Sequence, residues 1–119
     1  DGKMGLYDWQ CVAKGGWALD YSYAIGCALT VEDRRNWERD LMKLYLEHLK
    51  ARGVANLPTF EQAWLGYRQQ IFHAFVFAAM TIGSGALQPK MQSDEWCLVA
   101  INRYTEMMTD LESLDALSE

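Results

Sequence analysis

The carboxylate best placed for chemistry near the start of the chain is that of Asp8. It follows the apolar residues 4–7 and precedes Trp9-Gln10, and Gly15-Gly16 then breaks the segment. A carboxylate at the end of a hydrophobic strand is positioned to leave the sheet and coordinate a metal ion. The alternative is an aspartate that ends the strand and accepts hydrogen bonds from turn amides. On Asp8 alone, the turn interpretation is favoured.

The two histidines, His48 and His73, are the next candidates for catalysis or metal binding. They are expected on different helices, and the sequence has neither an HExxH motif nor a Cys/His cluster. His48 lies on an apolar stripe and His73 lies in an apolar run, which favours a hydrogen-bonded core position over a ligand role. The sequence therefore supports no zinc site.

Motifs for nucleophilic catalysis and phosphate binding are missing as well. The sequence contains no GxSxG, GxxxxGK(S/T) or GxGxxG pattern. The run Gly83-Ser84-Gly85 follows a predicted helix, so its amides cannot point along a helix N-terminus at an anion. The three cysteines (Cys11, Cys27 and Cys97) form no CxxC. We expect buried, reduced thiols in a cytoplasmic protein.

Composition limits the classes of partner. Half of the 119 residues are hydrophobic, with five Trp, six Tyr and four Phe, so a sizeable core can form. The net charge is -5 and no basic stripe follows a helix, so nucleic-acid binding has no electrostatic basis. The longest apolar stretch, 71–82, is shorter than the roughly 20 residues of a membrane span. No signal peptide is visible, and no membrane partner is expected.

The first half of the chain predicts a strand followed by two helices. Residues 4–12 are typical of one strand that pairs outside this chain. Residues 18–29 are apolar nearly all round, which predicts a short helix buried on most sides. Thr30 and Asp33 resemble a capping box that opens a helix over 31–52. Its apolar stripe comprises Trp37, Leu41, Leu44, Tyr45 and His48.

The second half predicts two more helices. Thr59 and Gln62 form a capping box for a helix over 60–82. Its stripe comprises Trp64, Tyr67, Ile71, Phe75, Ala78 and Ile82, and its second half, apolar all round, is expected at the centre of the core. A last helix starts at about Ser93 and buries Cys97, Ile101, Tyr104, Met108 and Leu111. The fold class is mainly α, with roughly four helices after a short β segment.

The order of these features carries a family resemblance. The relevant residues are Asp1-Gly2, the apolar strand to Tyr7, Asp8-Trp9-Gln10, the glycine turn, Leu19-Asp20-Tyr21, Glu32-Asp33-Arg34-Arg35, Glu38-Arg39, Leu41, Tyr45, Phe60-Glu61, Trp64 and Tyr67-Arg68. This order resembles the C-terminal lobe of aminoglycoside-phosphotransferase-like kinases. Within that superfamily, the order most resembles the branch of ecdysteroid-kinase-like and uncharacterised bacterial phosphotransferases. The resemblance covers almost the whole chain but only the C-terminal part of such an enzyme.

The resemblance implies roles for two aspartates within part of a protein-kinase-like C-lobe. Asp8 matches the aspartate of the DFG-like position, which holds Mg²⁺ at the ATP phosphates. Asp20 matches an aspartate in a buried helix that holds the catalytic loop through backbone hydrogen bonds, since burying it unpaired would be costly. Residues 16–18 stand where the family often has a proline-containing turn, so the turn geometry departs from the family pattern.

The catalytic base, one metal ligand and the adenine pocket that the family uses are absent from this sequence. Its HxD loop, with an asparagine further on, and its nucleotide-binding lobe should precede Asp1, so no catalytic residue is expected within residues 1–119. The chain opens with Asp1 instead of Met, and we expect a trimmed product or the tail of a longer protein. It is then a single or partial domain, inactive alone and binding neither Mg²⁺ nor ATP tightly.

Two functions follow from this sequence. The first is the C-terminal portion of an ATP-dependent kinase whose acceptor is the hydroxyl group of a small molecule. The second is a non-catalytic helical module that pairs with itself or with another protein. As an isolated chain it is expected to form a homodimer through residues 4–21, because Leu6, Trp9, Trp17 and Tyr21 would present an apolar patch.

Overall fold

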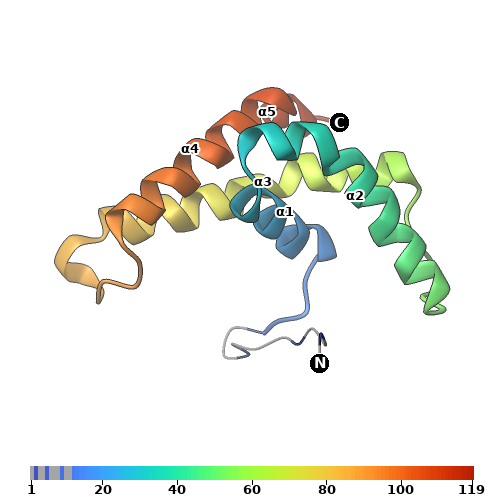
Figure 1. The fold of residues 1–119 in the computed structure, drawn as a ribbon, viewed down its shortest axis with the longest axis horizontal. Helices are drawn as coiled ribbons and strands as arrows, with labels where there is room; N and C mark the ends of the chain where they lie inside the picture. Colours follow the sequence, from blue (N-terminus) through green and yellow to red (C-terminus); the bar gives the residue numbers. More distant parts are fainter. Residues whose placement is uncertain (1, 3–4, 6–8, 10–11) are drawn as a thin grey trace.

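The structure is mainly helical, as the sequence predicts. A computed structural model of the chain describes residues 2, 5, 9 and 12–119. In this part of the chain the helices are α1 (Trp17–Ala28), α2 (Val31–Ala51), α3 (Phe60–Gly83), α4 (Asp94–Asp110) and the short α5 (Ser113–Ala116), with a 3-10 turn at Gly85–Leu87 (Figure 1). No strand occurs among the described residues, and most of the predicted strand at 4–12 lies outside them.

Side-chain caps mark where α2, α3 and α4 begin, and the caps of α2 and α3 were predicted from the sequence. The Asp33 amide donates to Thr30 Oγ1 at 3.1 Å and opens α2. At α3 the Gln62 amide donates to Thr59 Oγ1 at 3.2 Å, and the Thr59 amide donates to Gln62 Oε1 at 2.9 Å. Ser93 caps α4 in the same way as Thr30 caps α2. Each cap satisfies an amide that the helix itself cannot, which contributes about 1 kcal/mol.

Helix α3 is the centre of the structure. Helix α4 runs beside it in the opposite direction, and α1 packs against both (Figure 1). Small residues allow this close packing, because a Cβ at Gly26 of α1 would lie only 2.8 Å from Tyr104 Cε1 on α4. The core cluster comprises Met42, Ala63, Tyr67, Ile71, Ala74, Ala78, Ala100, Tyr104, Met107 and Leu111.

The inner face of α2 differs from the predicted stripe. Its buried residues are Arg34, Glu38 and Met42. Trp37 and Leu44, which the stripe places inside, are 49% and 48% exposed. The prediction was wrong at these positions because it counted only apolar residues as core formers. A charged residue can be buried when it is paired, which the contacts of Arg34 and Glu38 achieve.

The second half of α3 is not the centre of the core, contrary to the prediction. Ala74 and Ala78 are buried there, but Val76, Phe77 and Met80 are 49%, 40% and 64% exposed. The first half of α3 forms hydrogen bonds to α2 and α5 and also packs on α1, so it is enclosed more fully than the second half.

No described helix combines the length and the apolar character needed to cross a lipid bilayer.

Candidate functional site

Of the two predicted site aspartates, only Asp20 can be placed. Asp8, the predicted Mg²⁺ ligand, lies outside the described residues. Among the described residues no group of three or more His, Cys, Asp or Glu side chains is arranged to hold a metal ion. The metal role of Asp8 stays a prediction.

Asp20 lies in α1, as predicted, but it is exposed. No described residue donates a hydrogen bond to its carboxylate, so the predicted backbone hydrogen bonds are not made within this part of the chain. Water hydrates an exposed carboxylate, so the carboxylate of Asp20 needs no hydrogen-bond donor from the protein. Asp20 is the only charged residue of α1, and Ala24 and Ala28 on the same face are exposed with it. Its role as the anchor of a catalytic loop stays a prediction.

The histidines and cysteines form no site in the described part of the chain. His48 and His73 are both exposed, so the predicted core positions were wrong. His48 lines the cleft between α1 and α2. Cys97 is buried and Cys27 half-buried, both as free thiols, while Cys11 lies outside the described residues.

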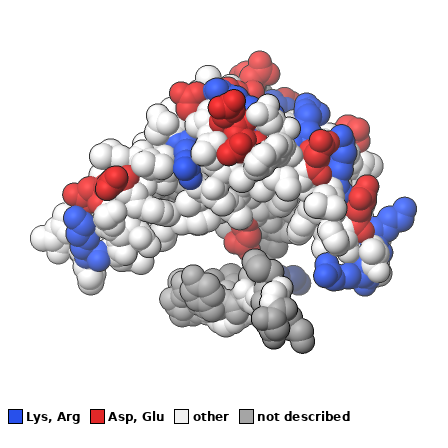
Figure 2. Space-filling view, viewed as in Figure 1, with Lys and Arg blue, Asp and Glu red and all other residues white. Residues whose placement is uncertain are grey.

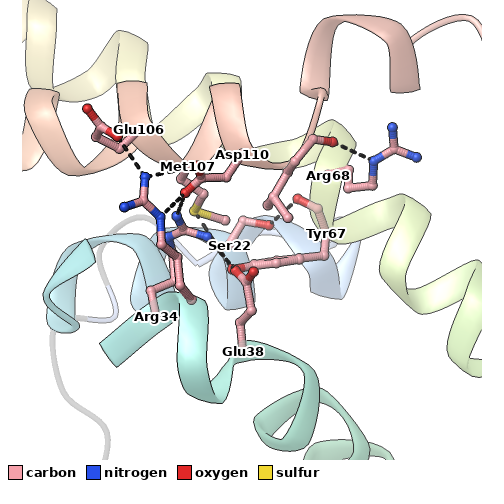
Figure 3. A network of polar contacts seen from close by, with 10 residues as sticks. Ser22, Arg34, Glu38, Tyr67, Arg68, Glu106, Met107 and Asp110 are labelled. Atoms are coloured by element: carbon pink, nitrogen blue, oxygen red, sulfur yellow. Dashed lines mark hydrogen bonds and ion pairs between the residues drawn. The ribbon is translucent and has the colours of Figure 1, made fainter. Parts of the chain in front are cut away.

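A buried network of charged and polar groups joins α2, α3 and α4 (Figure 3). Arg34 Nη1 donates to Glu38 Oε2 at 2.7 Å, and the Tyr67 hydroxyl donates to the same oxygen at 2.9 Å. Arg34 Nη2 pairs with Asp110 Oδ2 on α4. Arg34 and Glu38 are 1% and 7% exposed, so these contacts form in a water-poor interior where hydrogen bonds to charges are strong.

A second arginine extends the network to the surface. Arg35 donates through Nε to Asp110 Oδ2 at 2.7 Å and through Nη2 to Asp110 Oδ1 at 2.9 Å. Its Nη2 also reaches Glu106 Oε2 at 2.8 Å. Both arginines therefore bind Asp110, and these contacts connect α2 to the end of α4.

The network shifts the pKa values of Tyr67, Asp110 and Arg34. Burial raises the pKa of the Tyr67 hydroxyl well above its usual value, and the charge of Glu38 raises it further. The hydrogen bonds from Arg35 and Arg34 lower the pKa of the Asp110 carboxyl. Burial alone would lower the pKa of Arg34, but its bonds to Glu38 and Asp110 outweigh that effect and raise it. Tyr67 thus stays protonated and Asp110 ionised near neutral pH. This network suits the positioning of helices.

Sequence reasoning missed this network. One signal was present, because Arg34 and Glu38 are four residues apart and share a helix face. Their burial and the pairing with Asp110, which is 76 residues away from Arg34, depend on how α2 docks.

The described surface offers shallow clefts instead of a deep active site. One lies between α1 and α2 and is lined by Tyr21, Leu41, Tyr45 and other residues. Another, of about 500 Å³, lies between α2 and the start of α3 and contains Arg39. On the face shown in Figure 2, charged residues of both signs are interspersed, without a basic block.

Comparison of the chain with protein-family models, with curated proteins and with solved structures finds no match.

Proposed function

We propose that this chain is the C-terminal helical part of an ATP-dependent phosphotransferase that acts on a small-molecule hydroxyl group. The support comes from the order of motifs in the sequence; the proposal requires that a segment outside the described residues covers the outer face of α1. Asp20, Ala24 and Ala28 repeat every four residues along that face and are exposed. Alanines allow another backbone to approach closely, and the carboxylate at the start of this row can accept the amide hydrogens of that backbone.

In this proposal the face of α1 is covered by the catalytic loop of the enzyme. The loop supplies the general base, and Asp20 holds the loop in position through its backbone amides. Asp8 supplies a ligand to the Mg²⁺ that neutralises charge on the ATP phosphates. The buried network around Arg34 keeps α2 in place as part of the wall beside the acceptor. No described residue of this chain is assigned the role of base.

The proposal is tested on the longest reading frame that contains this sequence. It should encode an HxD loop upstream of Asp1 and should transfer phosphate from ATP to a member of a panel of alcohols and aminoglycosides. Asp8→Asn should abolish ADP release while leaving the circular dichroism spectrum unchanged. Asp20→Ala should lower kcat, and Asp20→Asn should retain more of it, because an amide oxygen still accepts hydrogen bonds.

Three results would overturn it. One is a reading frame without an HxD loop. Another is full turnover by Asp8→Asn in the long protein. The third is turnover by the 119-residue chain alone, because that chain lacks a base and a nucleotide lobe.

A second candidate function is a non-catalytic helical module that pairs with itself. The observation in its favour is Asp20, because a carboxylate that is exposed and accepts no described hydrogen bond needs no catalytic loop. Trp9 and Val12, which are 59% and 72% exposed, offer apolar surface for self-association. A reading frame without a kinase loop, together with a stable dimer, would select this function over the first.

A further inference from the structure

The cleft between α2 and the start of α3 combines positive charge with aromatic walls. Arg39 comes from α2, Phe60 and Trp64 from the first turns of α3, Arg68 from the next turn, and Glu119 from the last residue of the described chain. The combination of flat apolar surface and guanidinium groups is typical of sites for organic anions.

Arg39 supplies a cation whose guanidinium donates no hydrogen bond to any described residue. Its guanidinium carbon lies 4.4 Å from the centroid of the Trp64 ring and 5.9 Å from that of Phe60. The two rings stack on each other at 5.8 Å with an angle of 15°. Among the described residues, no carboxylate forms an ion pair with Arg39. The two rings therefore contact the flat face of the Arg39 guanidinium, and its N–H groups can donate hydrogen bonds to another partner.

Arg68 is fixed so that one end of its guanidinium holds a carboxylate. Its Nε donates to the Leu111 carbonyl at 2.7 Å, and its Nη2 donates to the Glu112 carbonyl at 3.3 Å. The remaining nitrogen, Nη1, donates to both side-chain oxygens of Glu119 at 3.0 Å. The Arg68 side chain is only 14% exposed, whereas that of Glu119 is 50% exposed. The exposed partner can leave while the buried arginine stays in place.

We propose that this cleft binds a small organic carboxylate with a flat apolar body. The carboxylate takes the place of the Glu119 side chain on Arg68 Nη1, Arg39 adds a second positive charge, and the apolar body lies against Trp64 and Leu65. Glu61 also lines the cleft. Once the Glu119 side chain is displaced, the charged side chains that line the cleft are those of Arg39, Arg68 and Glu61. Their net charge is +1. That balance favours a monoanion over a dianion such as phosphate.

Glu119 then acts as an internal competitor for the site. Its side chain shows the carboxylate position, and its removal should raise the affinity for an external carboxylate. This inference does not depend on the phosphotransferase proposal, because it uses only contacts within residues 39–119.

The test is a titration of the 119-residue chain with indole-3-propionate, followed by ¹⁵N–¹H NMR. Saturable shifts are expected at the Trp64 indole N–H and the Arg39 side chain. The neutral amide of the same compound should bind up to about five-fold more weakly, because an exposed ion pair contributes up to about 1 kcal/mol. Glu119→Gln should tighten binding of the carboxylate, and Arg39→Gln should weaken it by about five-fold.

Arg52→Gln is the matched control, since it removes an exposed arginine at the end of α2 outside this cleft. It should leave the affinity unchanged. Equal binding of the acid and the amide would overturn the proposal, as would an affinity that neither Arg39→Gln nor Glu119→Gln alters. Absence of saturable shifts at Trp64 in both the parent chain and Glu119→Gln would overturn it as well.

Discussion

Arg34 is the largest fully buried side chain in the described part of the chain. Its Nε is buried and has no hydrogen-bond partner among the described residues, so its desolvation is not fully compensated by them. The compensation that exists comes from Glu38 and Asp110, one on its own helix and one on α4. A buried ion pair of this kind adds little net stability over an apolar pair, but loss of one partner is costly.

Arg34→Met is therefore expected to destabilise the chain strongly. The change leaves the buried Glu38 without its cation, which should lower the free energy of unfolding by about 3–5 kcal/mol. Urea unfolding followed by circular dichroism measures this loss. The double change Arg34→Met with Glu38→Leu should recover part of the stability, because it removes the unpaired charge too.

Arg35→Met is the control for that prediction. Arg35 bonds to the same Asp110, but its side chain is 48% exposed. Exposed ion pairs contribute up to about 1 kcal/mol, so the loss should be much smaller. Equal losses for Arg34→Met and Arg35→Met would contradict the argument from burial.

Asp110 makes the stability of the folded chain depend on pH in the acidic range. Its hydrogen bonds with Arg35 and Arg34 lower the pKa of its carboxyl below the usual value. A carboxyl with a lower pKa in the folded state stabilises the fold above its unfolded pKa of about 3.9, and this contribution is lost as the pH falls through the folded pKa. The urea midpoint should therefore fall as the pH is lowered from about 5 towards 2, and it should fall less steeply in Asp110→Asn.

The matched control for this pH series is Asp115→Asn, which changes an exposed carboxylate of α5. It should keep the slope of the parent chain. A slope in Asp110→Asn identical to that of the parent would show that other carboxylates cause the acid dependence.

At the scale of the helices, the contact between α1 and α4 depends on one glycine. A Cβ at Gly26 would meet Tyr104 Cε1 at 2.8 Å, Tyr104 Cδ1 at 2.9 Å and Met107 Sδ at 3.0 Å. Tyr104 and Met107 are fully buried, so they have little room to move. Gly26→Ala should cost about 1–3 kcal/mol through overpacking, even though alanine favours the helix. Thermal unfolding measures this change.

Gly66→Ala is a suitable comparison, since Gly66 also lies within a helix. A Cβ there would meet only Ala18 Cβ at 3.4 Å, an ordinary contact distance. The change should be neutral or should stabilise the chain by up to about 1 kcal/mol, because alanine has the higher helix propensity. Destabilisation of both variants by the same amount would contradict the role given to the Tyr104 contact.

The elements themselves were largely predictable from the sequence, and their orientation was not. Thr59 and Gln62 marked the start of α3 because capping is a local property of a few residues. The inner face of α2 was misjudged because the burial of Arg34 depends on a partner that is distant in sequence. The exposure of Val76 and Met80 likewise depends on how far the neighbouring helices extend along α3, which a hydrophobic pattern does not encode.

At the scale of the whole molecule, apolar surface remains uncovered on the described part of the chain. Residues 12–16 are all exposed and lead into α1 from outside the helical body (Figure 1). Trp9 is exposed as well, and Trp17 is half-buried against Tyr21 and Tyr45. Soluble monomers rarely expose contiguous apolar patches larger than a few hundred Å². The sequence-based prediction of association through residues 4–21 is therefore retained as a proposal.

We expect the 119-residue chain to form a two-fold dimer through that segment, because a closed two-fold pair is the commonest oligomer. Light scattering should report twice the 13.6 kDa chain mass at high concentration, and Trp9→Lys should shift the equilibrium to the monomer by placing a charge in the interface. Leu117→Lys is the control, since Leu117 and Trp9 are both 59% exposed but Leu117 lies at the other end of the chain. Dissociation by both variants would place the interface elsewhere. A parent chain that stays monomeric at every concentration tested would refute the dimer.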